Sequence, residues 1–137
     1  MYKRILVPLS LEHGLAAEAL KVASALLDEG GTISALHVYE TPEGSVRAYL
    51  DEDAVRAGFD EARRRLEERV AGHPNVIAVL HKGHTARTIV DYAQEARIDC
   101  IVIGSHKPGL PDYLIGSTAA RVVRHAPCAV HVLRTSD

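Results

Sequence analysis

Short apolar runs alternate with segments of helical period along this chain, and that alternation is what most constrains its fold. The apolar runs suit strands covered on both faces, and they predict strands at 5–8, 32–39, 76–80, 100–104 and 128–133. Apolar residues at helical spacing predict helices at about 15–29, 51–71, 85–96 and 117–125. A strict alternation of strands and helices predicts a parallel sheet with helices on both of its faces.

Glycine and hydroxyl residues mark several of the predicted boundaries. Gly30 and Gly31 are expected to end the first helix, and Thr85 is the predicted N-cap of the third. Ligands of parallel sheets bind beyond the carboxyl ends of the strands, where the strand order reverses. We therefore expect the end of the first strand, Pro8 to Ser10, and the end of the fourth, Gly104, to flank a crevice.

Length and composition suit one globular domain spanning residues 1–137. The chain is 47% hydrophobic with a formal charge of −2, and its single phenylalanine and lack of tryptophan argue against a nucleic-acid partner. No apolar run approaches the roughly 20 residues that span a bilayer, and no signal peptide is recognisable. We expect a cytoplasmic protein with no membrane partner, whose Cys100 and Cys128 are reduced thiols.

The segment from Gly104 to Thr118 has the strongest signature of a binding site. A strand, a glycine-bearing loop and a helix N-terminus in succession place backbone N–H groups against an anion. Gly116 and Ser117 are the predicted amide donors, and Lys107 could add a charge. The plainer alternatives are a turn glycine, an ordinary helix cap and a solvated lysine. The segment lacks the Gly-Lys-Ser/Thr ending of a Walker loop.

Catalytic and metal-binding patterns are missing from the sequence. No serine lies in a Gly-x-Ser-x-Gly elbow, and the eight histidines show no metal-ligand spacing, so we expect neither a nucleophile nor a metal site. His37 and His131 lie inside strand patterns, and we interpret them as satisfied core or edge residues rather than ligands.

Taken in order, several segments resemble the universal stress protein family, and the resemblance covers essentially the whole chain. The segments are 5–8, 36–38, Gly83 with Ile89, 101–106, Gly116 with Ser117, and 121–130. The resemblance implies a universal stress protein fold of the adenine nucleotide alpha hydrolase type. That fold is a three-layer α/β/α arrangement with four helices and a five-stranded parallel sheet of order 3-2-1-4-5.

The resemblance also implies a site for ATP, with or without Mg²⁺, or for AMP or ADP. An adenine and ribose pocket is implied around Pro8, Leu9, Ser10 and Val38. Phosphate contacts are implied around the segment from Gly104 to Thr118. The residues expected there are Ile103, Gly104, His106, Lys107, Gly116, Ser117 and Thr118.

Two departures from the family pattern stand out. The family's nucleotide loop has glycine, two residues, glycine, nine residues, glycine, and then serine or threonine. Here Lys107 replaces the second glycine and eight residues separate it from Gly116, a form that looks like a subgroup of small bacterial members. Ser10 replaces the family's usual aspartate after the first strand, which removes an acceptor for adenine or ribose.

We therefore expect a stress-response protein that binds an adenine nucleotide and has at most very slow ATPase activity. A homodimer or homotetramer joined through the last strand, Ala129–Leu133, is the expected assembly, because uncovered sheet edges attract partners. The alternative is a nucleotide-independent interaction protein in which the loop serves assembly.

Overall fold

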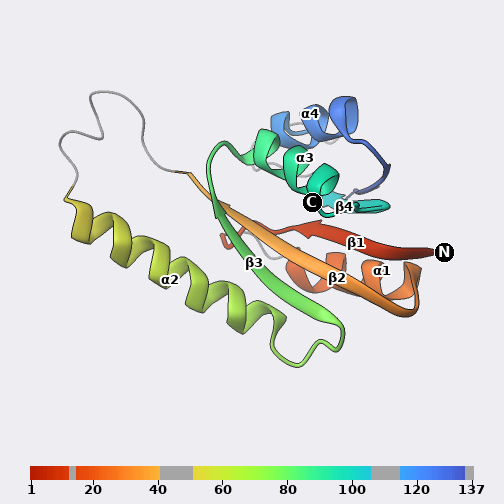
Figure 1. Ribbon diagram of the computed structural model, residues 1–137, viewed down its shortest axis with the longest axis horizontal. Helices are drawn as coiled ribbons and strands as arrows, with labels where there is room; N and C mark the ends of the chain where they lie inside the picture. The colour runs from red at the N-terminus through yellow and green to blue at the C-terminus, as the bar shows by residue number, and fades with distance from the viewer. Residues whose placement is uncertain (13–14, 41–50, 106–114, 135–137) are drawn as a thin grey trace.

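The computed structural model describes residues 1–12, 15–40, 51–105 and 115–134, and its elements follow the predicted order. Figure 1 shows a sheet with helices on both sides. The strands are β1 (Tyr2–Pro8), β2 (Leu27–Tyr39), β3 (Val76–Lys82), β4 (Cys100–Gly104) and β5 (Ala129–Leu133). The helices are α1 (Ala16–Leu26), α2 (Glu52–Val70), α3 (Thr85–Glu95) and α4 (Ser117–His125).

All neighbouring strands pair in parallel, in the order β3-β2-β1-β4-β5, which confirms the predicted 3-2-1-4-5 topology with four helices. Ile5 of β1 pairs with Ile33 of β2 on one side and with Cys100 of β4 on the other. The chain builds outwards from β1 to β3 and then crosses back to β4, so the strand order reverses between β1 and β4. A ligand site is expected at the carboxyl ends of these two strands.

Two apolar cores cover the two faces of the sheet. The core beneath α1 and α2 contains Ile5, Val7, Leu20, Ile33 and Leu66, and the opposite core contains Leu6, Leu36, Ile89, Ile101 and Val122. Consecutive residues of β1 therefore alternate between the two cores. This double burial explains why β1 and β4 appear as continuous apolar runs in the sequence.

The predicted end of the first helix is wrong. The helix ends at Leu26, and Gly30 and Gly31 lie inside β2, at a register shift where Tyr2 pairs with Leu27 but Arg4 pairs with Thr32. Gly30 has φ +81°, and a Cβ on Gly31 would lie 2.8 Å from the carbonyl oxygen of Lys3. These glycines therefore permit an irregularity and a close approach between two strands, rather than a helix end.

Other predicted boundaries differ from the structure by a few residues at most. Asp51 caps α2, its carboxylate accepting the Asp53 N–H at 2.9 Å, and β5 begins one residue later than predicted. Cys100 and Cys128 are both free thiols, as expected. Burial raises the pKa of Cys100 to about 11, so its thiol stays protonated at neutral pH. In the described ranges, none of the helices is long and apolar enough to cross a membrane.

Asp99 fastens the start of β4 to β1, so its removal should weaken the sheet. Its carboxylate accepts the Lys3 N–H at 2.9 Å and the Arg4 N–H at 3.0 Å, and its own N–H donates to the Arg4 carbonyl. Because an amide offers one acceptor oxygen, Asp99→Asn should lower the free energy of unfolding by about 1–2 kcal/mol in denaturant titrations. The control Asp91→Asn changes an exposed carboxylate 3.9 Å from Arg87 and should cost less than about 0.5 kcal/mol. Equal losses for the two variants would contradict this role.

Candidate functional site

A cavity of about 350 Å³ lies at the carboxyl ends of β1, β2 and β4, where the strand order reverses. Nine of the eleven predicted site residues line it: Pro8, Leu9, Ser10, Val38, Ile103, Gly104, Gly116, Ser117 and Thr118. His106 and Lys107 lie outside the described residues. The structure thus brings both ends of the predicted site together around one space, while the binding role of each residue stays a prediction.

The N-terminus of α4 lies at this cavity without a side-chain cap. Gly116 is the N-cap, and no side chain of the described chain bonds to the cap position. The helix's first backbone bond is from the Ala120 N–H to the Gly116 carbonyl. The N–H groups of Ser117, Thr118 and Ala119 therefore precede the helix's own hydrogen-bond ladder. All three residues line the cavity, and together with the helix dipole their amides suit an anion.

One predicted amide donor is already occupied. The Gly116 N–H donates to the Ser105 carbonyl at 3.0 Å, so it is not available to a phosphate as the sequence led us to expect. The Ser105 N–H in turn donates to the Leu133 carbonyl at 3.0 Å. These bonds hold the start of α4 against the end of β4 and tie that end to β5. The backbone donors that face the cavity therefore begin at Ser117, one residue later than predicted.

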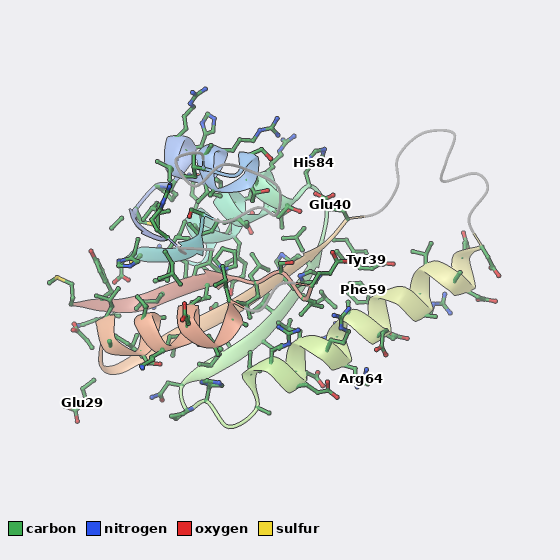
Figure 2. All side chains as sticks on the ribbon, turned by 180° about the vertical axis from the view of Figure 1, so that it is seen from behind. Glu29, Tyr39, Glu40, Phe59, Arg64 and His84 are labelled. Atoms are coloured by element: carbon green, nitrogen blue, oxygen red, sulfur yellow. The ribbon has the colours of Figure 1, made fainter. Side chains whose placement is uncertain are left out.

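A second helix, α3, also begins at the cavity, but its N-terminus is occupied from within the chain. One oxygen of the Glu40 carboxylate accepts both the Thr85 N–H, at 3.1 Å, and the Thr85 hydroxyl, at 2.6 Å. The predicted N-cap, Thr85, is therefore wrong: His84 is the N-cap and Thr85 is the first helical residue. Figure 2 shows Glu40 and His84 close together where β2 ends and α3 begins. The Glu40 carboxylate therefore already serves as the anion at the N-terminus of α3.

The electrostatics of Glu40 agree with this capping role. The hydrogen bond from the Thr85 hydroxyl, then that from the Thr85 N–H, and the nearby His84 hold the pKa of Glu40 below its ordinary value. The carboxylate is therefore charged throughout the neutral range. Of the two helix N-termini at the cavity, that of α4 is the one to which no carboxylate of the described residues is bonded.

The end of the cavity nearest β1 and β2 is largely apolar. Leu9 and Val38 are buried there, together with Leu36 and Ile89, which the sequence analysis did not include. The Ser10 hydroxyl accepts the Glu12 N–H at 3.3 Å, so the residue in place of the family's aspartate is engaged with its own loop. None of the described lining residues is acidic.

The loop after β1 is fixed by three basic side chains. Arg65 and Arg69, both on α2, donate to the Leu11 carbonyl at 2.6 and 2.9 Å. The Nδ1 atom of His37 lies 2.7 Å from the Leu9 carbonyl. The wall of the cavity formed by Leu9 and Ser10 is therefore held by contacts from α2 and β2.

Sequence reasoning missed several residues of the cavity wall. They are Leu15, Ala16, Ala19, Leu36, His37, Thr85, Ile89, Ser105 and Ala119. The alanines and leucines carry only an ordinary core pattern, so no sequence signal separates them from other core residues. Ser105, only 4% exposed, follows the strand end directly and could have been found from that position.

No metal centre was predicted, and the described ranges contain no group of three or more histidine, cysteine, aspartate or glutamate side chains that could hold a metal ion. The chemistry of the described site is therefore that of amide donors, hydroxyls and apolar walls.

The topology agrees with comparisons to known proteins. The profile of the universal stress protein family matches residues 1–134. The chain belongs to this family. Universal stress protein G of Salmonella typhimurium is 33% identical over 145 residues, covering 98% of this chain and 100% of that protein. The solved structure of universal stress protein UspA from Lactobacillus plantarum is 29% identical, with a TM-score of 0.69 and coverage of 97% of this chain and 98% of that one.

Two further solved universal stress proteins contain nucleotides. One, from Archaeoglobus fulgidus, is in complex with dAMP; it is 23% identical, with a TM-score of 0.60, and the match covers 97% of this chain and 98% of that one. The other is in complex with cAMP; it is 18% identical, with a TM-score of 0.65, and the match covers 98% of each chain.

The cap on α3 predicts a pH-dependent contribution to stability. Folding lowers the pKa of Glu40, so its carboxylate contributes fully to the stability of the folded state above the unfolded pKa of ~4.3. This contribution is lost as the pH falls through the lower pKa of the folded state. Glu40→Gln should therefore lower the free energy of unfolding by about 0.5 kcal/mol at pH 7, because the carboxylate is largely exposed. The difference from the wild type should vanish towards pH 3.

Glu29→Gln is the matched control, because Glu29 is an exposed carboxylate that points away from the chain in Figure 2. Urea titrations at several pH values should show no comparable pH-dependent difference for it. The capping role would be contradicted if the free energies of unfolding of the wild type and Glu40→Gln differed by the same amount from pH 7 to pH 3.

Proposed function

We propose that this universal stress protein binds ATP, or a related adenine nucleotide such as ADP or AMP, in the cavity at the carboxyl ends of β1, β2 and β4. The observation that carries the proposal is the N-terminus of α4 on the cavity wall, which no side chain of the described residues caps. The phosphates would accept from the amides of Ser117, Thr118 and Ala119, and the Ser117 hydroxyl would add a donor. The nucleoside would lie between Leu9 and Val38.

The size and polarity of the cavity support a ligand of this kind. Its volume of about 350 Å³ falls within the range of small-molecule sites, and it joins an apolar end to a set of amide donors. A nucleotide has the same polarity, with a planar base at one end and anionic oxygens at the other. The dAMP and cAMP complexes of the two structural neighbours add support for an adenine nucleotide.

Binding rather than catalysis is the role that the described residues support. Among the described residues, the lining contains no acidic side chain to act as a general base or to position a water, so we expect any ATP hydrolysis to be very slow. Mg²⁺, where it accompanies ATP, would be held by the phosphates and waters. Nucleotide occupancy would then act in the stress response through binding, in the cytoplasm.

Ser117→Asp tests the phosphate contact without threatening the fold. A carboxylate at the first position of α4 suits the helix dipole, so stability should be unchanged or slightly higher, while repulsion should weaken ATP binding at least tenfold. Titration calorimetry with Mg-ATP, ADP, AMP and adenosine measures the affinities, and thermal unfolding checks the fold.

Ala54→Asp is the control, because it adds the same charge to the exposed first turn of α2, which does not line the cavity. It should leave the affinity for ATP unchanged. The proposal fails if the wild type gives neither heat nor a thermal shift with any of the four ligands, or if both aspartate variants bind equally well.

We also propose that two copies of the chain pair through the outer edge of β5. Only β4 pairs with β5 in the described sheet, and Ala129 and His131 are exposed on it. Light scattering coupled to size exclusion should give a dimer for the wild type and a monomer for Ala129→Lys combined with His131→Lys, because edge lysines block strand pairing.

The control for the edge variant is Ala78→Lys, which alters an exposed residue of β3 at the opposite edge of the sheet. It should remain dimeric. A wild type that is monomeric at all concentrations, or a dimer that survives the double substitution, would contradict pairing through β5.

A further inference from the structure

Ser105 carries a buried hydroxyl that has no partner in the described chain. The residue directly follows β4, lines the cavity and is only 4% exposed. Its backbone is engaged, because its N–H donates to the Leu133 carbonyl and its carbonyl accepts the Gly116 N–H, each at 3.0 Å. No hydrogen bond joins the hydroxyl itself to any of the described residues. A buried polar group without a partner costs free energy, so this hydroxyl calls for a partner that enters the cavity.

The end of β4 directs this side chain towards α4. Side chains alternate between the two faces of a sheet along a strand. Ile103 packs in the same core as Ala119 of α4, whereas a Cβ on Gly104 would lie 3.2 Å from the side chain of Leu15, the N-cap of α1 on the opposite face. The Ser105 N–H continues the parallel bonding to β5. The strand geometry therefore extends to Ser105, and its side chain lies on the face that α4 covers.

On that face the hydroxyl lies beside the first turn of α4. The bond between the Ser105 carbonyl and the Gly116 N–H joins the end of β4 to the N-cap of this helix. Residues 117–119, whose N–H groups precede the helix's own hydrogen-bond ladder, line the same cavity. A hydroxyl can donate a hydrogen bond and a helix N-terminus carries partial positive charge, so both suit an anionic oxygen. The buried hydroxyl is thus a second observation, independent of the helix, that indicates a ligand at this end of the cavity.

We propose that Ser105 is a phosphate-binding residue, whose hydroxyl donates to a phosphate oxygen that the amides of α4 also bind. The inference rests on the proposed nucleotide site and goes beyond it, because it assigns a buried side chain at the end of β4 to the phosphates. It also separates binding from stability. A hydroxyl without a partner in the chain contributes to ligand affinity but not to the stability of the unliganded fold.

Ser105→Ala and its control, Ser34→Ala, should have opposite effects. Ser34 is also a buried serine, 6% exposed on β2, but its hydroxyl accepts from the Tyr92 hydroxyl at 3.2 Å and it does not line the cavity. We expect Ser105→Ala to bind ATP about tenfold more weakly in titration calorimetry, because a hydrogen bond to a charged oxygen is lost. Its melting temperature without ligand should be unchanged or higher. Ser34→Ala should melt about 3 °C lower and bind ATP as the wild type does.

Two further measurements assign the effect to the hydroxyl and to the phosphates. Ser105→Cys keeps a side chain of similar size but offers only a weak donor, so it should also bind ATP more weakly than the wild type. Adenosine lacks phosphates, and NMR titrations up to millimolar concentration should show that it binds the wild type and Ser105→Ala alike. The loss of affinity should therefore appear with the phosphorylated ligands alone.

The outcomes separate this inference from the proposed function. If the wild type binds ATP and Ser105→Ala binds it equally well, the phosphate role of Ser105 is wrong while nucleotide binding stands. Wild-type affinity in Ser105→Cys, or an equal loss of adenosine and ATP binding in Ser105→Ala, would overturn the inference in the same way. So would an unliganded Ser105→Ala protein that melts as low as Ser34→Ala, because its hydroxyl would then have a structural partner. If the wild type binds no nucleotide, both the proposed function and the inference fall.

Discussion

The position of β1 between β2 and β4 is the constraint on which the rest of this structure depends. Ile5, Leu6 and Val7 are fully buried, so both faces of the strand must be covered by helices. The chain leaves β1 towards β2 on one side and returns to β4 on the other. Helices α1 and α4, which follow β1 and β4 along the chain, therefore pack on opposite faces of the sheet, and residues of both line the cavity at the carboxyl ends of the strands.

The two helices that begin at this cavity differ in how their N-termini are capped. Glu40, from the end of β2, supplies a carboxylate to the start of α3, whereas no side chain of the described residues caps α4. An anion entering the cavity would meet a negative charge near the start of α3, and at the start of α4 backbone amides to which no described side chain is bonded. In the proposed complex, this asymmetry would orient the nucleotide with its phosphates towards α4 and its nucleoside between β1 and β2. The same asymmetry explains why Thr85 lines the cavity without being available as a phosphate cap.

Sequence reasoning reached a parallel sheet with helices on both faces because the strands are short apolar runs and the helices have clear apolar stripes, whereas the strand order came from the resemblance to the family. It also identified the cavity's two ends, since both follow strand ends. It failed where an interaction comes from a distant segment. Nothing near Thr85 indicates that Glu40 occupies its N–H, and nothing near Gly116 indicates that the Ser105 carbonyl accepts its N–H. Gly30 and Gly31 looked like a helix end because close strand approach and helix termination both favour glycine.

The most direct test of this account is an amide-resolved NMR titration of the protein with ATP. The account predicts that the largest shifts occur at the backbone amides of Ser117, Thr118 and Ala119. The amide of Gly116, which is bonded to Ser105, and that of Thr85, which is bonded to Glu40, should shift less. Largest shifts at Thr85, shifts confined to residues away from the cavity, or no shifts at saturating ATP would contradict the account.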